Sequence, residues 1–311
     1  MTRIQQPKGL YVLFLTEMWE RFSFYGLRAL LVLYLIQERG WSDSNAFSLF
    51  GAYAALVYAS PVIGGFIADK CLGFKRSVIL GGLLIMLGHF TLAIDGHRLF
   101  YIGLSFVVVG TGYLKSCISS LVGELYTQHD MRRDSGFTIF YMGINLGAFG
   151  AGIGVGLVAS VYGWHMAFGL AGIGMLIGLM CFIYGLRYLK DIGEPTNQAL
   201  LDKRLLPGLS LQTLIIVLSF ASLPLVSTLL QMTTIFSWLL IFFLILSAVF
   251  VWYMMTQIDK TARKKLSALI ILLLFSIGFW SLFEQAGSSI TMFTERGVNR
   301  EWLGMMIPTP A

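Results

Sequence analysis

Long apolar stretches recur along the chain and are separated by short polar segments. Each stretch has roughly 18 to 28 residues, enough to cross a hydrocarbon core about 30 Å thick at 1.5 Å per helical residue. Lipid offers the backbone no hydrogen-bond partner, so we expect every stretch to be a helix. The pattern predicts an all-α membrane protein with about nine transmembrane helices, over residues 10–36, 46–68, 77–95, 99–126, 136–160, 166–188, 208–229, 234–257 and 266–294.

The polar segments divide these helices into groups. Short loops join the first six, whereas the longest polar segment, RYLKDIGEPTNQALLDKRLLPG, follows the sixth. The next two helices hold no charged residue between Gly208 and Ile258, so they can face lipid and are expected to be peripheral. We therefore expect a six-helix bundle over 1–190, a linker over 191–207, two extra helices over 208–257, and a further core helix with its tail over 258–311.

Composition and charge support a membrane protein. Hydrophobic residues make up 57% of the chain and charged residues 12%, against about 25% charged in ordinary soluble domains. Most of the 22 Lys and Arg residues gather in the loops on the side of the N-terminus. The positive-inside rule then places the N-terminus in the cytoplasm. The net charge of +6 follows from this asymmetry and does not indicate nucleic-acid binding, and the three separated cysteines suggest neither a metal site nor a disulfide framework.

Charged residues nevertheless occur inside the first apolar stretch, which contains TEMWERFSFYG (16–26). A charge at mid-membrane costs about 2.5–3.5 kcal/mol, so such residues are candidates for function. At 100° per residue, Glu17, Glu20, Arg21, Tyr25 and Arg28 fall on one stripe of the helix. Glu17 can pair with Arg21 one turn away, and the second carboxylate, Glu20, predicts a site that binds and releases a proton. The alternative is a static charge network that fixes helix packing.

Three further helices carry candidate residues. Lys115 lies deep in the fourth helix within GTGYLKSCISS, far from either end, so Glu17, Glu20 or an anionic substrate are its expected partners. In FTIFYMGINLGAF (137–149), Tyr141 and Asn145 share a helix face, and contact with a neighbouring helix is as plausible as contact with a ligand. The last helix carries Glu284.

Four stretches resemble motifs of the proton-dependent oligopeptide transporters, a branch of the major facilitator superfamily. TEMWERFSFYG (16–26) matches the ExxER motif of that family, and GGFIADKCLGFKR (64–76) resembles the superfamily signature between the second and third helices. The stretches 137–149 and 279–289 resemble two further family motifs. The resemblance implies a major facilitator fold in which residues 208–257 form the two extra helices of bacterial members and residues 266–294 the seventh core helix.

The resemblance also implies roles for individual residues. Proton coupling is expected of Glu17, Glu20, Arg21 and Lys115. Peptide binding is expected of Arg28, Tyr25, Lys115, Asn145 and Glu284. Tyr141 is a further candidate because it shares a helix face with Asn145. Gating is expected of Asp69, Arg28 and Glu284, where Asp69 can cap or face a neighbouring helix end.

The function implied by the resemblance is proton-coupled uptake of di- and tripeptides across the bacterial inner (plasma) membrane, driven by the proton gradient without a metal or organic cofactor. The chain shows no Ser/His/Asp set, zinc motif or nucleotide loop, so an enzyme is not expected. The superfamily has two six-helix halves, whereas this sequence stops after the seventh core helix. Three alternatives stay open. The C-terminal half belongs to a longer chain or comes from a separate one, the chain is a truncated non-transporting remnant, or it transports another small anion such as nitrate.

Overall fold

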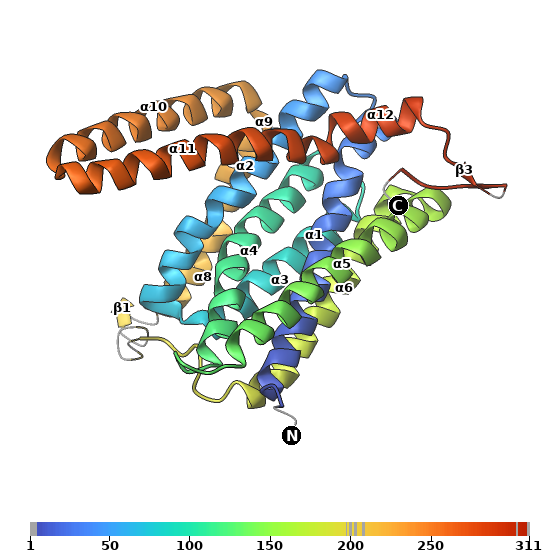
Figure 1. Ribbon diagram of the computed structural model, residues 1–311. Coiled ribbons are helices and arrows are strands. Elements are labelled where there is room, and N and C mark those ends of the chain that lie inside the picture. Colours follow the sequence, from blue (N-terminus) through green and yellow to red (C-terminus); the bar gives the residue numbers. More distant parts are fainter. Residues whose placement is uncertain are drawn as a thin grey trace.

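The computed structural model describes residues 5–196, 198, 201, 204–206, 209–302 and 304–309, and it is almost entirely helical (Figure 1). The first part of the chain forms α1 (Lys8–Leu33) with the π-helical turn η1 (Tyr34–Glu38), α2 (Asp43–Ile67) with the turn η2 (Ala68–Leu72), α3 (Phe74–Leu92), α4 (His97–Glu124), α5 (Arg133–Tyr162), and α6 (Trp164–Gly185) with η3 (Leu186–Tyr188). The later part forms β1 (Arg204–Leu206), β2 (Leu209–Ser210), α8 (Leu211–Ala221), α9 (Leu223–Gln231), α10 (Thr233–Gln257), α11 (Lys260–Phe283), η4 (Glu284–Gly287), α12 (Ser289–Gly297), β3 (Glu301–Trp302) and β4 (Met305–Met306).

The predicted all-α membrane architecture is confirmed. Within the described residues, 8 helical segments are long and apolar enough to cross a membrane. The one predicted helix that is not among these eight is α1, which is of comparable length but carries the charged stripe. The four strands are two or three residues long and form two small antiparallel hairpins, with Arg204 opposite Ser210 and Glu301 opposite Met306.

Two predicted helices are interrupted. The helix predicted over 208–229 divides into α8 and α9 at Ser222, because Pro224 stands in the first turn of α9 and provides no backbone N–H to continue α8. The prediction of one uninterrupted helix over 266–294 is wrong. The chain tightens into the 3₁₀ turn η4, and Ser288 (φ −135°, ψ −97°) leaves helical geometry before α12 begins.

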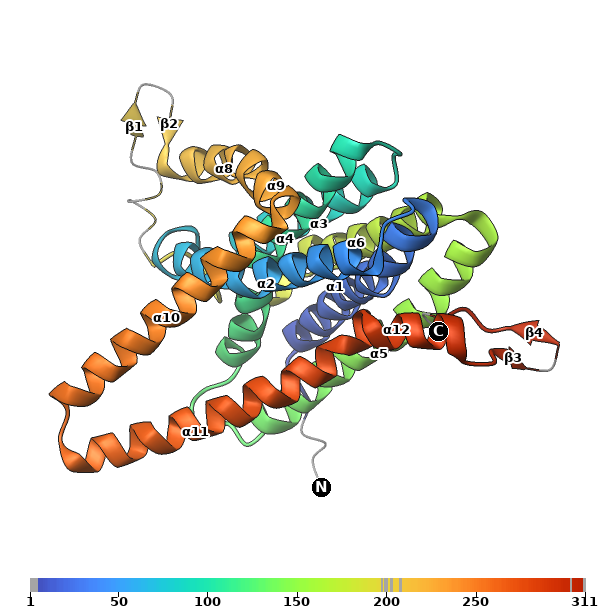
Figure 2. The same ribbon diagram turned by 90° about the horizontal axis from the view of Figure 1, so that it is seen from above.

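Helices α1 to α6 form one bundle, in which α1 lies against α5 and α6 while α4 lies against α2 and α3 (Figure 2). Glycines set the approach of α1. A side chain at Gly147 of α5 would collide with the carbonyl oxygen of Met18, and a Cβ on Gly178 of α6 would lie 3.0 Å from Cβ of Trp19. Small residues at such crossings allow close backbone contact in membrane helices, so α5 and α6 hold the charged part of α1 in place.

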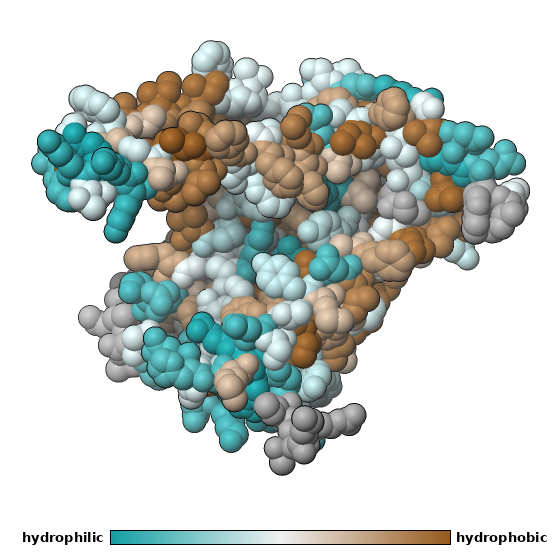
Figure 3. All heavy atoms as spheres, in the orientation of Figure 1, coloured by the Kyte–Doolittle hydropathy of each residue, from teal (hydrophilic) through white to brown (hydrophobic). Residues whose placement is uncertain are grey.

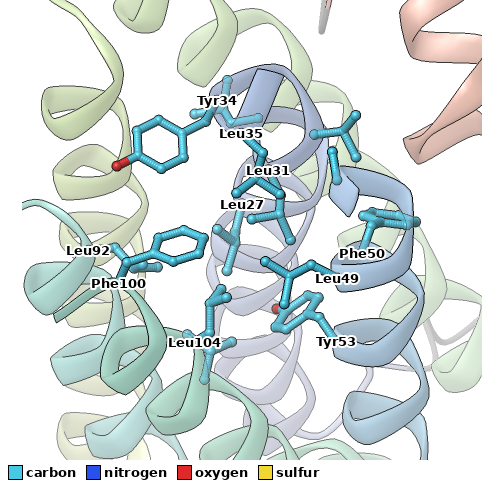
Figure 4. Close-up of a cluster of buried hydrophobic side chains, with 14 of the residues drawn as sticks. Leu27, Leu31, Tyr34, Leu35, Leu49, Phe50, Tyr53, Leu92, Phe100 and Leu104 are labelled. Carbon is cyan, nitrogen blue, oxygen red and sulfur yellow. The ribbon is translucent and has the colours of Figure 1, made fainter. Parts of the chain in front are cut away.

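The core has two apolar layers with a polar layer between them along α1. One cluster surrounds the C-terminal half of α1, where Leu27, Leu31 and Tyr34 pack against α2 and α4 (Figure 4). A second cluster surrounds Leu10 and Leu13 at the beginning of α1. The buried polar residues of α1, Thr16, Glu17, Glu20, Arg21 and Ser23, lie between the two.

The end of the bundle near the N-terminus is held by polar contacts with the segment that follows α6. Lys75 donates hydrogen bonds to the backbone oxygen of Lys190 and, at 2.6 Å, to Oε1 of Glu194. Glu124, at the end of α4, accepts a hydrogen bond from the backbone of Gly193 at 2.8 Å. In the neighbouring turn, hydrogen bonds from Arg132 lower the pKa of the Asp130 carboxyl to about 2.

Helices α10 and α11 extend away from the bundle at a steep angle to it and are joined at their far ends (Figure 1). In the most apolar 18 residues of each helix, 6% of the residues are buried in α10 and none in α11. Hydrophobic atoms cover much of both helices, and hydrophilic atoms gather at the tip that joins them (Figure 3). Uncovered apolar helices of this length match a hydrocarbon environment.

The division into 1–190, 191–207, 208–257 and 258–311 stays a prediction, and residues 197, 199–200, 202–203 and 207 of the linker lie outside the described residues.

Candidate functional site

The centre of the candidate site is a buried cluster of three charged residues on α1. Glu17, Glu20 and Arg21 are 4%, 1% and 6% exposed. Nε of Arg21 lies 3.0 Å from Oε1 of Glu17 and also contacts Oε2 of Glu20. One guanidinium therefore serves two carboxylates. The pairing of Glu17 with Arg21 is the one that the sequence predicts.

The cluster leaves several polar atoms unsatisfied. Oε2 of Glu17, Oε1 of Glu20 and Nη2 of Arg21 are buried and have no hydrogen-bond partner among the described residues. Buried polar atoms without partners are costly and are usually explained by a function, a water or an ion. Each carboxylate thus keeps one oxygen open for a proton, and protonation of either one would weaken its attraction to Arg21.

A second ion pair lies about two to three turns further along α1. Nη2 of Arg28 is 2.9 Å from Oε2 of Glu284, with the two side chains 12% and 26% exposed. Glu284 begins the turn η4 at the end of α11, and Gly287 at the end of this turn packs against Phe50 and Arg28. Arg28 and Glu284, for which the resemblance implies roles in peptide binding and gating, are thus an ion pair in the structure. The role of this pair in gating stays a prediction.

Lys115 does not form the ion pair expected of it. No carboxylate of the described residues lies within ion-pairing distance, and its Nζ lies 3.8 Å from the centre of the Tyr58 ring and 5.9 Å from that of Phe24. A desolvated ammonium on an aromatic face gains a cation–π attraction. The expectation of a direct contact with Glu17 or Glu20 is therefore not met in this conformation.

Tyr58 of α2 is a site residue that sequence reasoning missed. Its ring lies under Lys115, and its hydroxyl donates a hydrogen bond to Oε1 of Glu284 at 3.4 Å. It thus joins Lys115 to the Arg28–Glu284 pair. No charge or spacing pattern in α2 distinguishes this tyrosine from others in apolar helices, so tertiary contact alone identifies it.

The remaining predicted peptide contacts are arranged less tightly. Tyr25 is half-buried, and the guanidinium of Arg28 lies 5.9 Å from the centre of its ring. Tyr141 and Asn145 are exposed, and Nδ2 of Asn145 donates to the backbone oxygen of Tyr141 at 3.0 Å. Both lie on the face of α5 opposite Gly147, and no hydrogen bond joins either one to the charged residues described above.

Asp69 was expected to cap or face a neighbouring helix end. Instead its exposed carboxylate pairs with the adjacent Lys70 at 3.0 Å, with both side chains more than half exposed. The backbone oxygen of Asp69 accepts a hydrogen bond from the Thr196 hydroxyl, in the segment after α6, at 3.0 Å, and the charged side chain that pairs with this segment is Lys75. A role of Asp69 in gating stays a prediction. Among the described residues, no group of three His, Cys, Asp or Glu side chains could hold a metal ion.

Comparison with known proteins places this site in a family context. The model of the POT family, named PTR2, matches residues 75–311. A di-/tripeptide transporter of Lactococcus lactis subsp. lactis is 37% identical over 316 residues, covering 96% of this chain and 64% of that protein. The uncharacterized transporter YclF of Bacillus subtilis is 36% identical over 302 residues, covering 94% and 61%.

Solved structures give the same result. A crystal structure of a peptide transporter POT in complex with sulfate matches with a TM-score of 0.83 and 34% identity, covering 100% of this chain and 65% of that one. The chain thus spans just under two thirds of the length of the relatives it matches. The family match covers more than half of the chain, and the folds agree over its whole length. The chain belongs to the POT family of membrane transporters.

Proposed function

We propose that this chain takes part in proton-coupled symport of di- and tripeptides into the cell. The proposal rests on membership of the POT family and on similarity to a protein named as a di-/tripeptide transporter. The observation that carries it is the charged stripe of α1, where two carboxylates with open oxygens share one arginine, and a separate cation pair, Arg28 and Lys115, lies nearby on the same side of the bundle.

The proton step uses the Glu17–Arg21–Glu20 cluster. A proton on either carboxylate removes one negative charge from a buried site, so the hold on Arg21 weakens. A charge change of this kind shifts the balance between conformations that differ in how Arg21 is paired. Both carboxylates are buried and end in an atom without a partner, so the proton has an acceptor position in the resting structure.

The peptide step uses two cations that other side chains contact in this structure. The carboxylate of Glu284 forms an ion pair with Arg28, and the ring of Tyr58 covers the ammonium of Lys115. The C-terminal carboxylate of a peptide can replace Glu284 at Arg28 and attract Lys115. Replacement of one carboxylate by another releases η4 from α1, which couples peptide binding to movement of the last long helix.

The energy source is the proton gradient, and no metal or organic cofactor takes part. Each proton that moves inward across 100 mV supplies about 2.3 kcal/mol, enough for a roughly 40-fold peptide gradient. The chain is not an enzyme under this proposal. The excess of basic residues in the loops on the side of the N-terminus supports an N-terminus in the cytoplasm and a location in the inner membrane.

Uptake into liposomes tests the proposal. The purified chain is reconstituted, and entry of radiolabelled dialanine is followed with and without an inward proton gradient. Gradient-driven uptake in the wild type, lost in Glu20→Gln and kept in Glu38→Gln, supports the proposal, since Glu38 is an exposed carboxylate outside the cluster. Folded wild-type protein without uptake at any gradient would refute transport by these 311 residues alone and favour either a second polypeptide or a non-transporting remnant. Competition by nitrate instead of dipeptides would favour an anion transporter.

A further inference from the structure

Four arginines lie at the end of the molecule where α1 ends and α4 begins, and three of them are neutralised. Arg39 pairs with Asp95 at 3.0 Å, Arg296 with Asp43 at 2.7 Å, and Arg300 with Glu295 at 3.1 Å. Arg98, in the first turn of α4, is exposed and forms no hydrogen bond or ion pair with any described residue. This end of the molecule thus carries one cation without a protein partner in the part of the chain that the structure describes.

Arg98 stands at the mouth of a crevice between α4 and the α8–α9 segment. The crevice has a volume of about 490 Å³, within the usual range of ligand sites. Its polar lining lies where α4 begins and α9 ends, at His97, Arg98, Thr228 and Gln231. Its apolar lining lies deeper, at Ile102, Phe106, Phe220 and Leu223.

The crevice runs along α4 from Arg98 to Phe106. From Arg98 to Phe106, α4 rises eight residues, or about 12 Å, which is close to half of a hydrocarbon core about 30 Å thick. There the rings of Phe106 and Phe220 meet edge to face, with 5.9 Å between their centres. The crevice therefore passes from a cationic rim to an apolar floor within about one leaflet.

We propose that this crevice binds one anionic phospholipid, with an acyl chain along Ile102 and Phe106 and the phosphate at Arg98. The polarity gradient matches that of a lipid, and the rim supplies a positive charge for the headgroup. The amide of Gln231 already donates to Ser227, so recognition of the charge falls mainly to Arg98. A bound lipid would fill the space between α4 and the peripheral segment and hold the two together.

A neighbouring crevice provides an internal comparison. It lies between α2, α4 and the same α8–α9 segment, has a volume of about 410 Å³, and is lined by apolar and hydroxyl side chains without a charged residue. It can accept an acyl chain or detergent but offers no charge to a headgroup. Preference for an anionic lipid therefore distinguishes the proposed site from general contact with hydrocarbon.

Native mass spectrometry of the purified full chain in detergent tests the proposal. Phosphatidylglycerol and phosphatidylcholine with identical acyl chains are added at equal concentration, and retained lipid is counted. We expect the wild type to retain phosphatidylglycerol about fivefold more strongly, the ratio expected for one basic residue worth about 1 kcal/mol. Arg98→Ala should abolish this preference. Arg133→Ala, which removes an exposed arginine at the opposite end, should keep it.

A second pair of variants tests the acyl part while leaving all charges in place. Ile102→Trp fills the proposed crevice and should reduce retention of phosphatidylglycerol, whereas Ile63→Trp, in the neighbouring crevice, should not. Equal retention of both lipids by the wild type, or equal behaviour of Arg98→Ala and Arg133→Ala, would overturn the proposal. Displacement of the lipid by inorganic phosphate alone, or a dimer that excludes lipid from the crevice, would also overturn it.

Discussion

Nη2 of Arg28 lies 2.9 Å from Oε2 of Glu284 and thereby ties the first helix of the chain to the point where its last long helix breaks. Helix α11 is otherwise exposed along its length. The ion pair, together with the packing of Gly287 on Phe50 and Arg28, is therefore a main attachment of this helix to the bundle. A contact of this kind can transmit a change of charge at α1 to α11, a helix without a buried residue.

Removal of either partner of this pair is expected to lower stability. Loss of one partner of a fully buried pair costs about 3–5 kcal/mol, and exposed pairs contribute about 0–1 kcal/mol. With side chains 12% and 26% exposed, we expect about 1–3 kcal/mol for Arg28→Ala or Glu284→Ala. Thermal unfolding in detergent measures the effect.

The double variant and a surface pair provide the controls. Arg28→Ala with Glu284→Ala should cost less than the two single changes added together, because neither charge is left unpaired. Arg296→Ala, which breaks an exposed pair with Asp43, should change little. Strict additivity of the two single changes would show that the pair is not energetically coupled.

Tyr58 is expected to shield Lys115 through its ring, with little contribution from its hydroxyl. A cation–π contact worth about 0.5–1 kcal/mol corresponds to a two- to fivefold change in the fraction of Lys115 side chains that are released from the ring and able to react. Acylation of Lys115, followed by mass spectrometry, should accelerate by about that factor in Tyr58→Leu and stay near the wild-type rate in Tyr58→Phe. Equal acceleration in both variants would assign the protection to the hydroxyl and its bond to Glu284.

Gly147 is expected to tolerate no side chain, because a Cβ there would collide with the carbonyl oxygen of Met18 and lie 3.0 Å from Cβ of Arg21. Overpacking of a close contact costs about 1–3 kcal/mol, so Gly147→Ala should lower the unfolding temperature. Gly278→Ala is the matched control in an open part of α11, and a better helix former there should be neutral or slightly stabilising. Equal effects of the two changes would contradict the close approach of α5 to α1.

Lys75 is expected to protect the segment after α6 from proteolysis. Replacement by Met removes the hydrogen bonds to Lys190 and Glu194. Because half of the Glu194 side chain is exposed, we expect a loss of about 1 kcal/mol, or roughly fivefold faster cleavage by trypsin after Lys190. Lys70→Met removes an equal charge from an exposed pair and should leave cleavage unchanged. A cleavage rate in Lys75→Met equal to that in Lys70→Met would show that Lys75 does not hold this segment.

Most of the fold was predictable because membrane helices are specified by long apolar runs. Even the close contacts of α1 could be expected from the glycines of α5 and α6. The break between α11 and α12 was not predicted, since no proline marks it and only Gly287 followed by Ser288 and Ser289 weakens the helix there. The turn η4 at this break lies against Arg28 and Phe50, a tertiary contact that the sequence does not reveal.

The candidate site was predictable where charges within one helix specify their own partners. Glu17 and Arg21 are one turn apart, so their pairing follows from helix geometry. Partners on different helices were harder to predict. Lys115 contacts Tyr58 in place of a carboxylate, and the side chain of Lys75, rather than the carboxylate of Asp69, pairs with the segment after α6. The deciding neighbour lies on another helix for Lys115 and in the segment after α6 for Lys75, and no sequence pattern marks either one.

Isothermal titration of the purified chain with dialanine, in two buffers of different ionisation enthalpy at the same neutral pH, tests the central claim most directly. The dependence of the heat on the buffer gives the number of protons exchanged on binding. Our account predicts that the wild type and Glu38→Gln take up protons when the peptide binds, and that this uptake disappears in Glu20→Gln. Peptide binding without proton exchange in the wild type, or unchanged exchange in Glu20→Gln, would contradict a proton site at the α1 cluster.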